Sequence, residues 1–323
     1  MTIPDPDIGH RRRGRVFRLA AAGILAAAIG VAPSPAVDAA VRCGCTANEP
    51  PIAYVRNVTD GGGAEIFRMN ADGSGQTRVT NSPGFDSFPS WSPDRSRVVY
   101  ATDRHSVNHI ENFELHVIDA TGANDRRLTD QARNDTEPAW SPTGDKIAFT
   151  SNRDFNSEIY VVNADGTGLR NLTMVQAEDT QPAWSADGTQ LAFVRQTPQG
   201  SRHIFIMNAD GTGVRQLTFG SLSKRNPAWS PDGSTIAFSM LASGNEDVFT
   251  TSSAGVSFPR RVTTRPEPDT FPTWSPDGRI AYAGAGDIRV VRPDGTGDTA
   301  LTTHPDFEFR PQWARPPQPV LSP

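Results

Sequence analysis

The chain has 323 residues, of which 36% are hydrophobic, and a formal net charge of −5. Its 28 glycines and 27 prolines, at ordinary hydrophobicity, are typical of many short strands joined by tight turns. Because the chain is acidic and has no basic stripe, we exclude nucleic acid as a partner.

Residues 1–39 have the pattern of an export signal peptide. Arginines between Arg11 and Arg18 precede a run of fourteen apolar or small residues, 19–32, and further small residues follow up to Ala39. The run is shorter than the roughly 20 residues that span a bilayer, and this order of features is typical of a cleaved signal. We expect an exported protein, periplasmic, cell-wall associated or extracellular, with no stable membrane span after cleavage. An uncleaved anchor is the alternative.

Residues 40–50 form a short leader that contains the two cysteines of the chain, Cys43 and Cys45. One residue separates them, which fits neither a disulfide framework nor a four-ligand zinc site. We assign them no function. Removal of residues 1–39 would take away five arginines and three aspartates and change the net charge from −5 to −7.

The tryptophans recur with a period near 45 residues. The spacings between successive tryptophans are 49, 44, 45, 45 and 39 residues. The six are Trp91, Trp140, Trp184, Trp229, Trp274 and Trp313. Each has a proline two residues before it, and a turn follows the first five, such as the S-P-D-G of residues 275–278. One aromatic signature per unit of this length is typical of a propeller blade.

Strands follow each turn in a fixed order. A second strand such as 146–149 (K-I-A-F) precedes an alternating third strand such as 158–162 (E-I-Y-V-V). A turn at 163–168 (N-A-D-G-T-G) then leads to a short fourth strand at 170–173. Four antiparallel strands per unit predict one blade. The segment 163–168 superficially resembles the start of a calcium loop but lacks the glutamate expected at the twelfth position, so we interpret it as a turn.

The two ends of the repeat region complement each other. Residues 51–54 match a second strand that has no tryptophan before it, whereas 310–313 match a first strand that has no second strand after it. Pairing these ends gives one composite blade and leaves no sheet edge exposed. The sequence therefore predicts an all-β, six-bladed β-propeller over residues 51–314, followed by a Pro-rich tail, 315–323. We expect a monomer.

These motifs resemble the TolB-like class of propeller repeats, also called W-S-P-D-G repeats. The elements D-x-x-P-x-W, S-P-D-G, I-A-F, N-A-D-G-x-G and R-x-L-T recur in this order in most copies. The resemblance implies a propeller that carries a binding surface. We expect the chain to lack the separate N-terminal domain that TolB itself has.

Residues that recur in every blade are expected to stabilise the blade rather than bind a ligand. We therefore interpret the six tryptophans as core residues between blades. Another recurring position lies three residues before each repeat proline. It is occupied by Asp86, Asp135, Asp179, Lys224, Asp269 and Glu308. The five carboxylates are predicted to circle the mouth of the central channel. There they would be either structural hydrogen-bond partners or ligands of a divalent cation.

Function is expected where the repeat is broken. In blade four, His203 replaces the acid that precedes other third strands, and in the connection leaving this blade Lys224 and Arg225 replace an Asp-Thr pair. The blade-two loop, 103–112, is enlarged and contains His105 and His109. We predict that these five residues form the ligand-binding part of the mouth, with Lys224 and Arg225 attracting an anionic group. Solvated surface charge is the alternative for each of them.

The sequence contains no catalytic or phosphate-binding motif of the common enzyme classes. Variable loops on a rigid scaffold often bind ligands, and here they connect second to third strands and one blade to the next. We therefore predict a non-enzymatic binding or scaffold protein that engages a protein or peptide at the loop-rich mouth and needs no cofactor. The alternative is a carbohydrate-active enzyme such as a polysaccharide lyase, with His105, His109, His203 and Asp269 as candidate metal ligands or catalytic groups.

Overall fold

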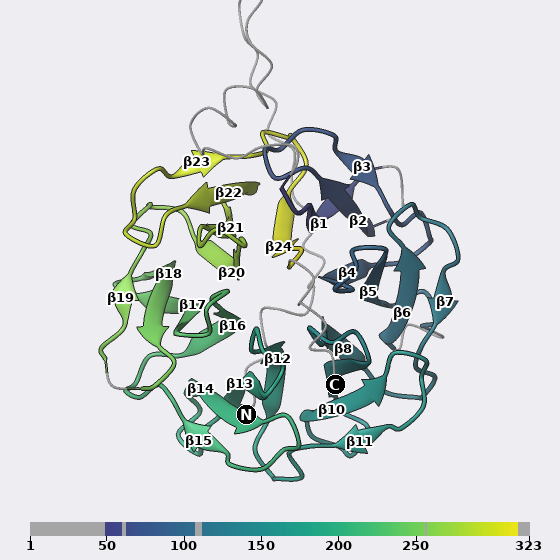
Figure 1. Ribbon diagram of the computed structural model, residues 1–323, viewed down its shortest axis with the longest axis horizontal. Coiled ribbons are helices and arrows are strands. Elements are labelled where there is room, and N and C mark those ends of the chain that lie inside the picture. The colour runs from purple at the N-terminus through teal and green to yellow at the C-terminus, as the bar shows by residue number, and fades with distance from the viewer. Residues whose placement is uncertain (1–48, 60–62, 107–111, 256, 316–323) are drawn as a thin grey trace, which may run out of the picture. The chain divides into compact units, whose positions relative to one another are not determined.

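The computed structural model describes residues 49–59, 63–106, 112–255 and 257–315. These residues form 24 strands, arranged as six four-stranded sheets in a ring (Figure 1). The predicted all-β, six-bladed propeller is confirmed. Within the described ranges no helix is long and apolar enough to cross a membrane. The predicted signal, Cys43, Cys45, His109 and the tail from residue 316 lie outside the described residues.

The first three blades run from the composite blade along the chain. Blade 1 contains β24 (Glu308–Trp313), β1 (Ile52–Val58), β2 (Gly63–Met69) and β3 (Thr77–Arg78). Blade 2 contains β4 (Asp86–Trp91), β5 (Arg97–Thr102), β6 (Glu114–Asp119) and β7 (Arg126–Arg127). Blade 3 contains β8 (Asp135–Trp140), β9 (Lys146–Ser151), β10 (Glu158–Asn163) and β11 (Arg170–Asn171).

The other three blades repeat the same order of strands. Blade 4 contains β12 (Asp179–Trp184), β13 (Gln190–Gln196), β14 (Arg202–Asn208) and β15 (Arg215–Gln216). Blade 5 contains β16 (Lys224–Trp229), β17 (Thr235–Ala242), β18 (Asn245–Ser252) and β19 (Arg260–Arg261). Blade 6 contains β20 (Asp269–Trp274), β21 (Ile280–Gly284), β22 (Asp287–Val291) and β23 (Thr299–Ala300).

The ring closes in blade 1, where the two ends of the repeat region pair. Strand β24 lies antiparallel to β1, with Ile52 opposite Trp313 and Arg56 opposite Glu308. The backbone nitrogen of Asn57 extends the ladder by donating to Phe307 O at 2.9 Å. The predicted composite blade is confirmed, and hydrogen bonds rather than a covalent link hold the ring closed.

Side-chain hydrogen bonds fix the tight turns. In the N-A-D-G-T-G segment, Asp165 Oδ1 accepts bonds from Thr167 N at 2.9 Å and Thr167 Oγ1 at 2.7 Å. Gly168 has a φ of +68°, and a Cβ at this position would lie 2.6 Å from Asn163 Nδ2. Only glycine fits this backbone without strain, so the segment is a turn.

Each inner strand ends in a buried tryptophan that packs between two blades. Trp184 of blade 4, for example, belongs to one core cluster with Ile159 and Val161 of blade 3. Its Nε1 donates to Ala139 O of blade 3 at 3.0 Å. Trp229 makes the corresponding bond to Ala183 O at 3.0 Å. Trp274 makes the same bond to Ala228 O at 3.1 Å, so the tryptophans of blades 4 to 6 connect successive blades by hydrogen bonds as well as by packing.

The antiparallel order of strands gives the ring two different faces. The turns between first and second strands, and between third and fourth strands, lie on one face, which we call the turn face. The loops between second and third strands, and the connections between blades, lie on the other, which we call the loop face. Each inner strand runs from the loop face to the turn face, so its tryptophan lies near the turn face.

Candidate functional site

The five predicted channel-mouth carboxylates begin the inner strands of their blades and have no exposed surface. An arginine of the same blade binds most of them. Arg195 binds Asp179 through two bonds, of 2.7 and 2.6 Å, and Arg56 Nε donates to Glu308 Oε1 at 2.7 Å. Asp86, Asp135, Asp179, Asp269 and Glu308 are therefore buried between strands, and arginine covers most of them; their role as structural partners or cation ligands stays a prediction.

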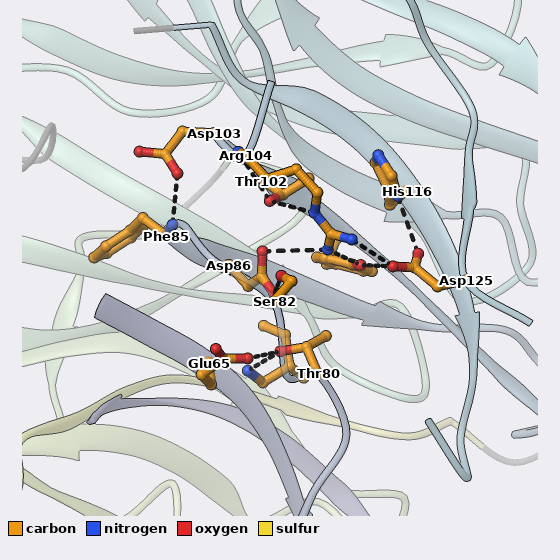
Figure 2. Close-up of polar contacts among 12 residues, drawn as sticks. Glu65, Thr80, Ser82, Phe85, Asp86, Thr102, Asp103, Arg104, His116 and Asp125 are labelled. Carbon is orange, nitrogen blue, oxygen red and sulfur yellow. Dashed lines mark hydrogen bonds and ion pairs between the residues drawn. The ribbon is translucent and has the colours of Figure 1, made fainter. Parts of the chain in front are cut away.

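These carboxylates lie at junctions between blades, where a second buried acid from the preceding blade lies near most of them. At the junction of blades 1 and 2, Thr80 Oγ1 donates to Glu65 Oε2 at 2.6 Å and accepts a bond from Ile66 N at 2.9 Å (Figure 2). Burial raises the pKa of Glu65, and Asp86 of the next blade raises it further, whereas Thr80 and Arg78 lower it. The recurring threonine of the R-x-L-T motif thus binds a buried acid at the junction.

At the junction of blades 4 and 5, both acids are replaced by basic residues. His203 stands at the position of Glu65, and Lys224 stands at the position of Asp86. His203 is 4% exposed and Lys224 is 2% exposed, so both are buried rather than on the mouth surface. Burial and the nearby Lys224 lower the pKa of His203, and burial lowers the pKa of Lys224, whose Nζ donates to Phe219 O at 2.6 Å. His203 and Lys224 thus lie close enough for their charges to interact, and both are buried; their role in ligand binding stays a prediction. Arg225 is half-buried, and its role in ligand binding stays a prediction.

A different ring of residues lines the channel on the side of the loop face. One residue from each blade, directly before the repeat proline, contributes to a cavity of about 120 Å³ that is large enough for several water molecules. These residues are Phe88, Glu137, Gln181, Asn226, Phe271 and Arg310. We call them the pre-proline ring. All six have φ between 51° and 58°, in the left-handed region that non-glycine residues seldom adopt.

A β-bulge produces this conformation in each inner strand. The register of β12 against β13, for example, shifts between Thr180 and Ala183, and Gln181 lies within the shift. A bulge redirects a side chain, and strained backbone conformations often occur at functional sites. The sequence analysis missed these residues, although the second variable position of D-x-x-P-x-W changes from blade to blade and was the available signal.

Polar side chains form one half of the pre-proline ring, in blades 3 to 5. Glu137 Oε2 accepts bonds from Thr150 Oγ1 at 2.7 Å and from the backbone nitrogen of Gln181 at 2.9 Å. Gln181 Oε1 in turn accepts a bond from Asn226 N at 2.7 Å. These bonds satisfy backbone groups that the bulges leave unpaired. They hold Glu137 and Gln181 in place at the cavity.

Aromatic rings and a guanidinium group form the other half. The Cζ of Arg310 in blade 1 lies 3.6 Å from the ring centroid of Phe88 and 4.8 Å from that of Phe271. Arg310 Nη1 also donates to Ser87 Oγ at 2.9 Å. Cation–π contact with two rings holds the charge in place. The cavity is thus chemically asymmetric, with a cation on one side and amide and carboxylate groups on the other.

Arg315 crosses the channel near the turn face. It follows the closing strand β24 of blade 1, yet its Nη2 donates to Trp184 O at 2.9 Å and its Nη1 to Ser185 O at 3.3 Å, both in blade 4. Burial lowers the pKa of Arg315 to about 10. Blades 1 and 4 are opposite each other in the ring, so this side chain spans the channel. Ligand access to the pre-proline ring is therefore expected from the loop face.

The candidate metal ligands predicted for an enzyme lie in different blades. His105 lies in the loop of blade 2, His203 in blade 4 and Asp269 in blade 6. Among the described residues, no three His, Cys, Asp or Glu side chains gather as a metal-binding group. The enzyme alternative therefore has no metal cluster in the described part of the channel.

The loop face carries several large apolar side chains in exposed positions. Phe155 is 83% exposed in the loop between β9 and β10, Met174 is 79% exposed between blades 3 and 4, and Phe219 is 67% exposed between blades 4 and 5. Leu222 and Leu241 are also exposed there. We call these five residues the loop-face apolar residues. They belong to blades 3 to 5 and their connections, and Phe307, which is 55% exposed between blades 6 and 1, adds a further apolar side chain to the loop face.

Comparison with known proteins identifies relatives of the propeller. Residues 105–226 match the family model of the TolB beta propeller domain. The chain is similar to TolB from Acinetobacter baumannii, with a TM-score of 0.70 and 22% identity over 86% of this chain and 71% of that chain. It is also similar to a putative TolB from Agrobacterium tumefaciens, with a TM-score of 0.64 and 19% identity over 83% and 94% of the two chains.

An enzyme shares the fold as well. An oligogalacturonate lyase from Vibrio parahaemolyticus matches with a TM-score of 0.52 and 14% identity over 75% of this chain and 72% of that chain. The comparison with curated proteins found no match. The family model identifies residues 105–226 as repeats of the TolB beta propeller domain, and the solved TolB structures share the propeller fold of this chain.

Proposed function

We propose that this protein is an exported, non-enzymatic binding protein that engages a protein or peptide on the loop face of its propeller. The observation that carries the proposal is that exposed apolar side chains and the cavity of the pre-proline ring occur on the same side of the ring. Exposed large apolar residues that gather on one surface are typical of protein-interaction sites. A rim of such residues around a small polar cavity suits an extended peptide segment that inserts one side chain or terminus.

The side of the cavity formed by Arg310, across from the half that contains Glu137, favours a ligand group with an acidic end. Arg310 is the cation of the pre-proline ring, and a guanidinium can hold a carboxylate by two parallel hydrogen bonds. Gln181 and Asn226 on the other side offer amide groups, which suit peptide backbone. We infer that a carboxylate of the partner reaches Arg310 while apolar side chains of the partner cover the loop-face apolar residues.

Substitutions of exposed phenylalanines test which face binds. Phe155→Ser and Phe219→Ser are expected to weaken binding of the partner at least tenfold, about 1.4 kcal/mol, without changing the melting temperature. Phe258 is 97% exposed between β18 and β19, on the turn face, and Phe258→Ser is the matched control.

The partner can be found with a photo-crosslinking amino acid at position 155 or 219, with position 258 as the control. The partner is then purified for titration. Capture at position 258 alone, or equal loss of affinity in all three variants, would contradict binding at the loop face.

Export remains a proposal that rests on residues 1–39. TolB-like relatives of the periplasm are compatible with it. N-terminal sequencing of the protein from the producing cell is expected to start after residue 39. The lyase alternative is supported by the shared fold with the Vibrio enzyme, but no described cluster of metal ligands or catalytic groups favours it.

A further inference from the structure

The loop of blade 2 holds a pair of histidines that the proposed function does not use. His105 Nε2 and His116 Nε2 face each other at 2.9 Å, and the two rings are nearly coplanar, with an interplanar angle of 21°. His116 lies on β6, within the blade, and His105 is half-buried at the edge of the loop. Two imidazole nitrogens in this position share one proton between them or bind one metal ion.

His116 stands where four of the other blades have an aromatic residue and blade 6 has an arginine. The corresponding third-strand positions, opposite the same point of the second strand, are Phe67, Tyr160, Phe205 and Phe249 in blades 1, 3, 4 and 5, and Arg289 in blade 6. Arg289 binds Asp298, with Nε 3.1 Å from Oδ1. A polar side chain at this position must find partners, and His116 differs from Arg289 in facing a second imidazole as well as a carboxylate.

The partner of the second ring nitrogen orients His116 as a metal ligand. His116 Nδ1 lies 3.0 Å from Asp125 Oδ1 (Figure 2). A carboxylate accepts, so Nδ1 carries the proton and Nε2 has its lone pair directed toward His105. A carboxylate behind an imidazole is the usual support of a metal-bound histidine, because it fixes the tautomer and the ring orientation.

Nearby charges leave the histidine pair in nearly neutral surroundings. Arg104 Nη1 binds Asp125 Oδ2 at 2.6 Å, and Arg127 Nη2 lies 3.0 Å from Glu114 Oε1 and 2.7 Å from Asp130 Oδ1. Burial, followed by Arg127, lowers the pKa of His105.

We propose that His105 and His116 form a binding site for one late first-row divalent transition-metal ion. Imidazole suits copper, zinc and nickel, whereas calcium and magnesium prefer oxygen ligands. Nitrogens bound at about 2.0–2.1 Å to one tetrahedral ion lie roughly 3.3 Å apart. A small rotation of the half-buried His105 increases the separation to this value. The ion replaces the shared proton, and water completes its coordination.

Isothermal titration and thermal melting of the full chain, without a polyhistidine tag, test the site. Cu²⁺ is expected to bind more tightly than Zn²⁺ or Ni²⁺ with one ion at the pair, and each is expected to raise the melting temperature. Mg²⁺ and Ca²⁺ are expected to have no effect. His105→Ala and His116→Phe are each expected to raise the dissociation constant at least tenfold.

The substitutions have internal controls. His116→Phe places in blade 2 the residue that blades 1, 4 and 5 already carry, so it is expected to fold. His304 has a carboxylate neighbour, with Nδ1 3.6 Å from Asp306 Oδ2, and His304→Ala is expected to bind metal as tightly as the wild type. Equal Cu²⁺ and Zn²⁺ affinities of wild type and His116→Phe would show that the pair is a hydrogen bond only and would overturn the proposal. Unchanged binding by His105→Ala would equally exclude a two-histidine site.

Discussion

Two neighbouring junctions have the same arrangement of strands but buried residues of opposite charge. The junction of blades 3 and 4 has acidic residues where the junction of blades 4 and 5 has basic residues. Glu158 binds Thr173, and Asp179 of the next blade binds Arg195. One blade further, the corresponding positions hold His203 and Lys224, and Lys224 donates to a backbone carbonyl. The geometry of the junction is thus independent of the sign of the charge. The second junction nevertheless leaves the buried His203 Nδ1 without a hydrogen-bond partner, and an unpaired buried polar group is costly.

Among the residues of the two junctions, the tryptophans are expected to make the largest contribution to the free energy of unfolding. This contribution is expected to be the same at both junctions. Trp184 and Trp229 are both buried and bind Ala139 O and Ala183 O at 3.0 Å. Trp184→Ala and Trp229→Ala are each expected to lower the free energy of unfolding by about 3–5 kcal/mol, the usual cost of removing a large buried aromatic side chain. Urea unfolding measures both. A difference of more than about 1.5 kcal/mol between the two variants would show that the charge reversal also changes the packing.

The charged residues of the two junctions are expected to differ in how much their removal lowers the free energy of unfolding. Asp179→Ala leaves Arg195 largely buried without its carboxylate, which typically costs about 3–5 kcal/mol. Lys224→Met keeps most of the apolar stem and leaves one carbonyl without its donor, for which we expect about 1–2 kcal/mol. Urea unfolding at neutral pH measures both values. An equal or larger loss in Lys224→Met would mean that Lys224 stabilises an acid of the protein or a bound anion.

The smallest expected effect is a pH dependence of opposite sign at two junctions. Burial raises the pKa of Asp269 to about 6, above its unfolded value of about 3.9. The folded protein therefore binds the extra proton, and the contribution of this group is lost as the pH rises through about 6. The pKa of His203 is lowered, so the unfolded chain binds the extra proton. Stability is then lost as the pH falls through about 6.5.

Two variants separate these contributions. Relative to the wild type, Asp269→Asn is expected to be more stable at pH 8 than at pH 5, whereas His203→Asn is expected to be more stable at pH 5 than at pH 8. The difference per group is at most about 1.4 kcal/mol per pH unit. Thermal melts of the three proteins across this range measure it. Parallel pH profiles would mean that neither group changes its protonation on folding.

The repeat and its closure were predictable because they depend on local chemistry. Proline and glycine fix the turns, alternation fixes the strand faces, and the unmatched ends at 51–54 and 310–313 complement each other. The joint departure of His203 and Lys224 from the repeat also led us to place them in the same part of the channel mouth. None of these inferences requires the distance between two blades.

The candidate site depends on the tertiary structure. A bulge decides that Phe88, Gln181 and Arg310 face the cavity, and packing between blades decides that Asp179 and Lys224 are buried. Arg315 reaches Trp184 only because closure of the ring places blade 1 opposite blade 4. The sequence by itself determined the elements and their order, since these follow from patterns within one blade. Only the closed ring decided which side chains converge, because convergence depends on the distance and direction between blades that are far apart in the chain.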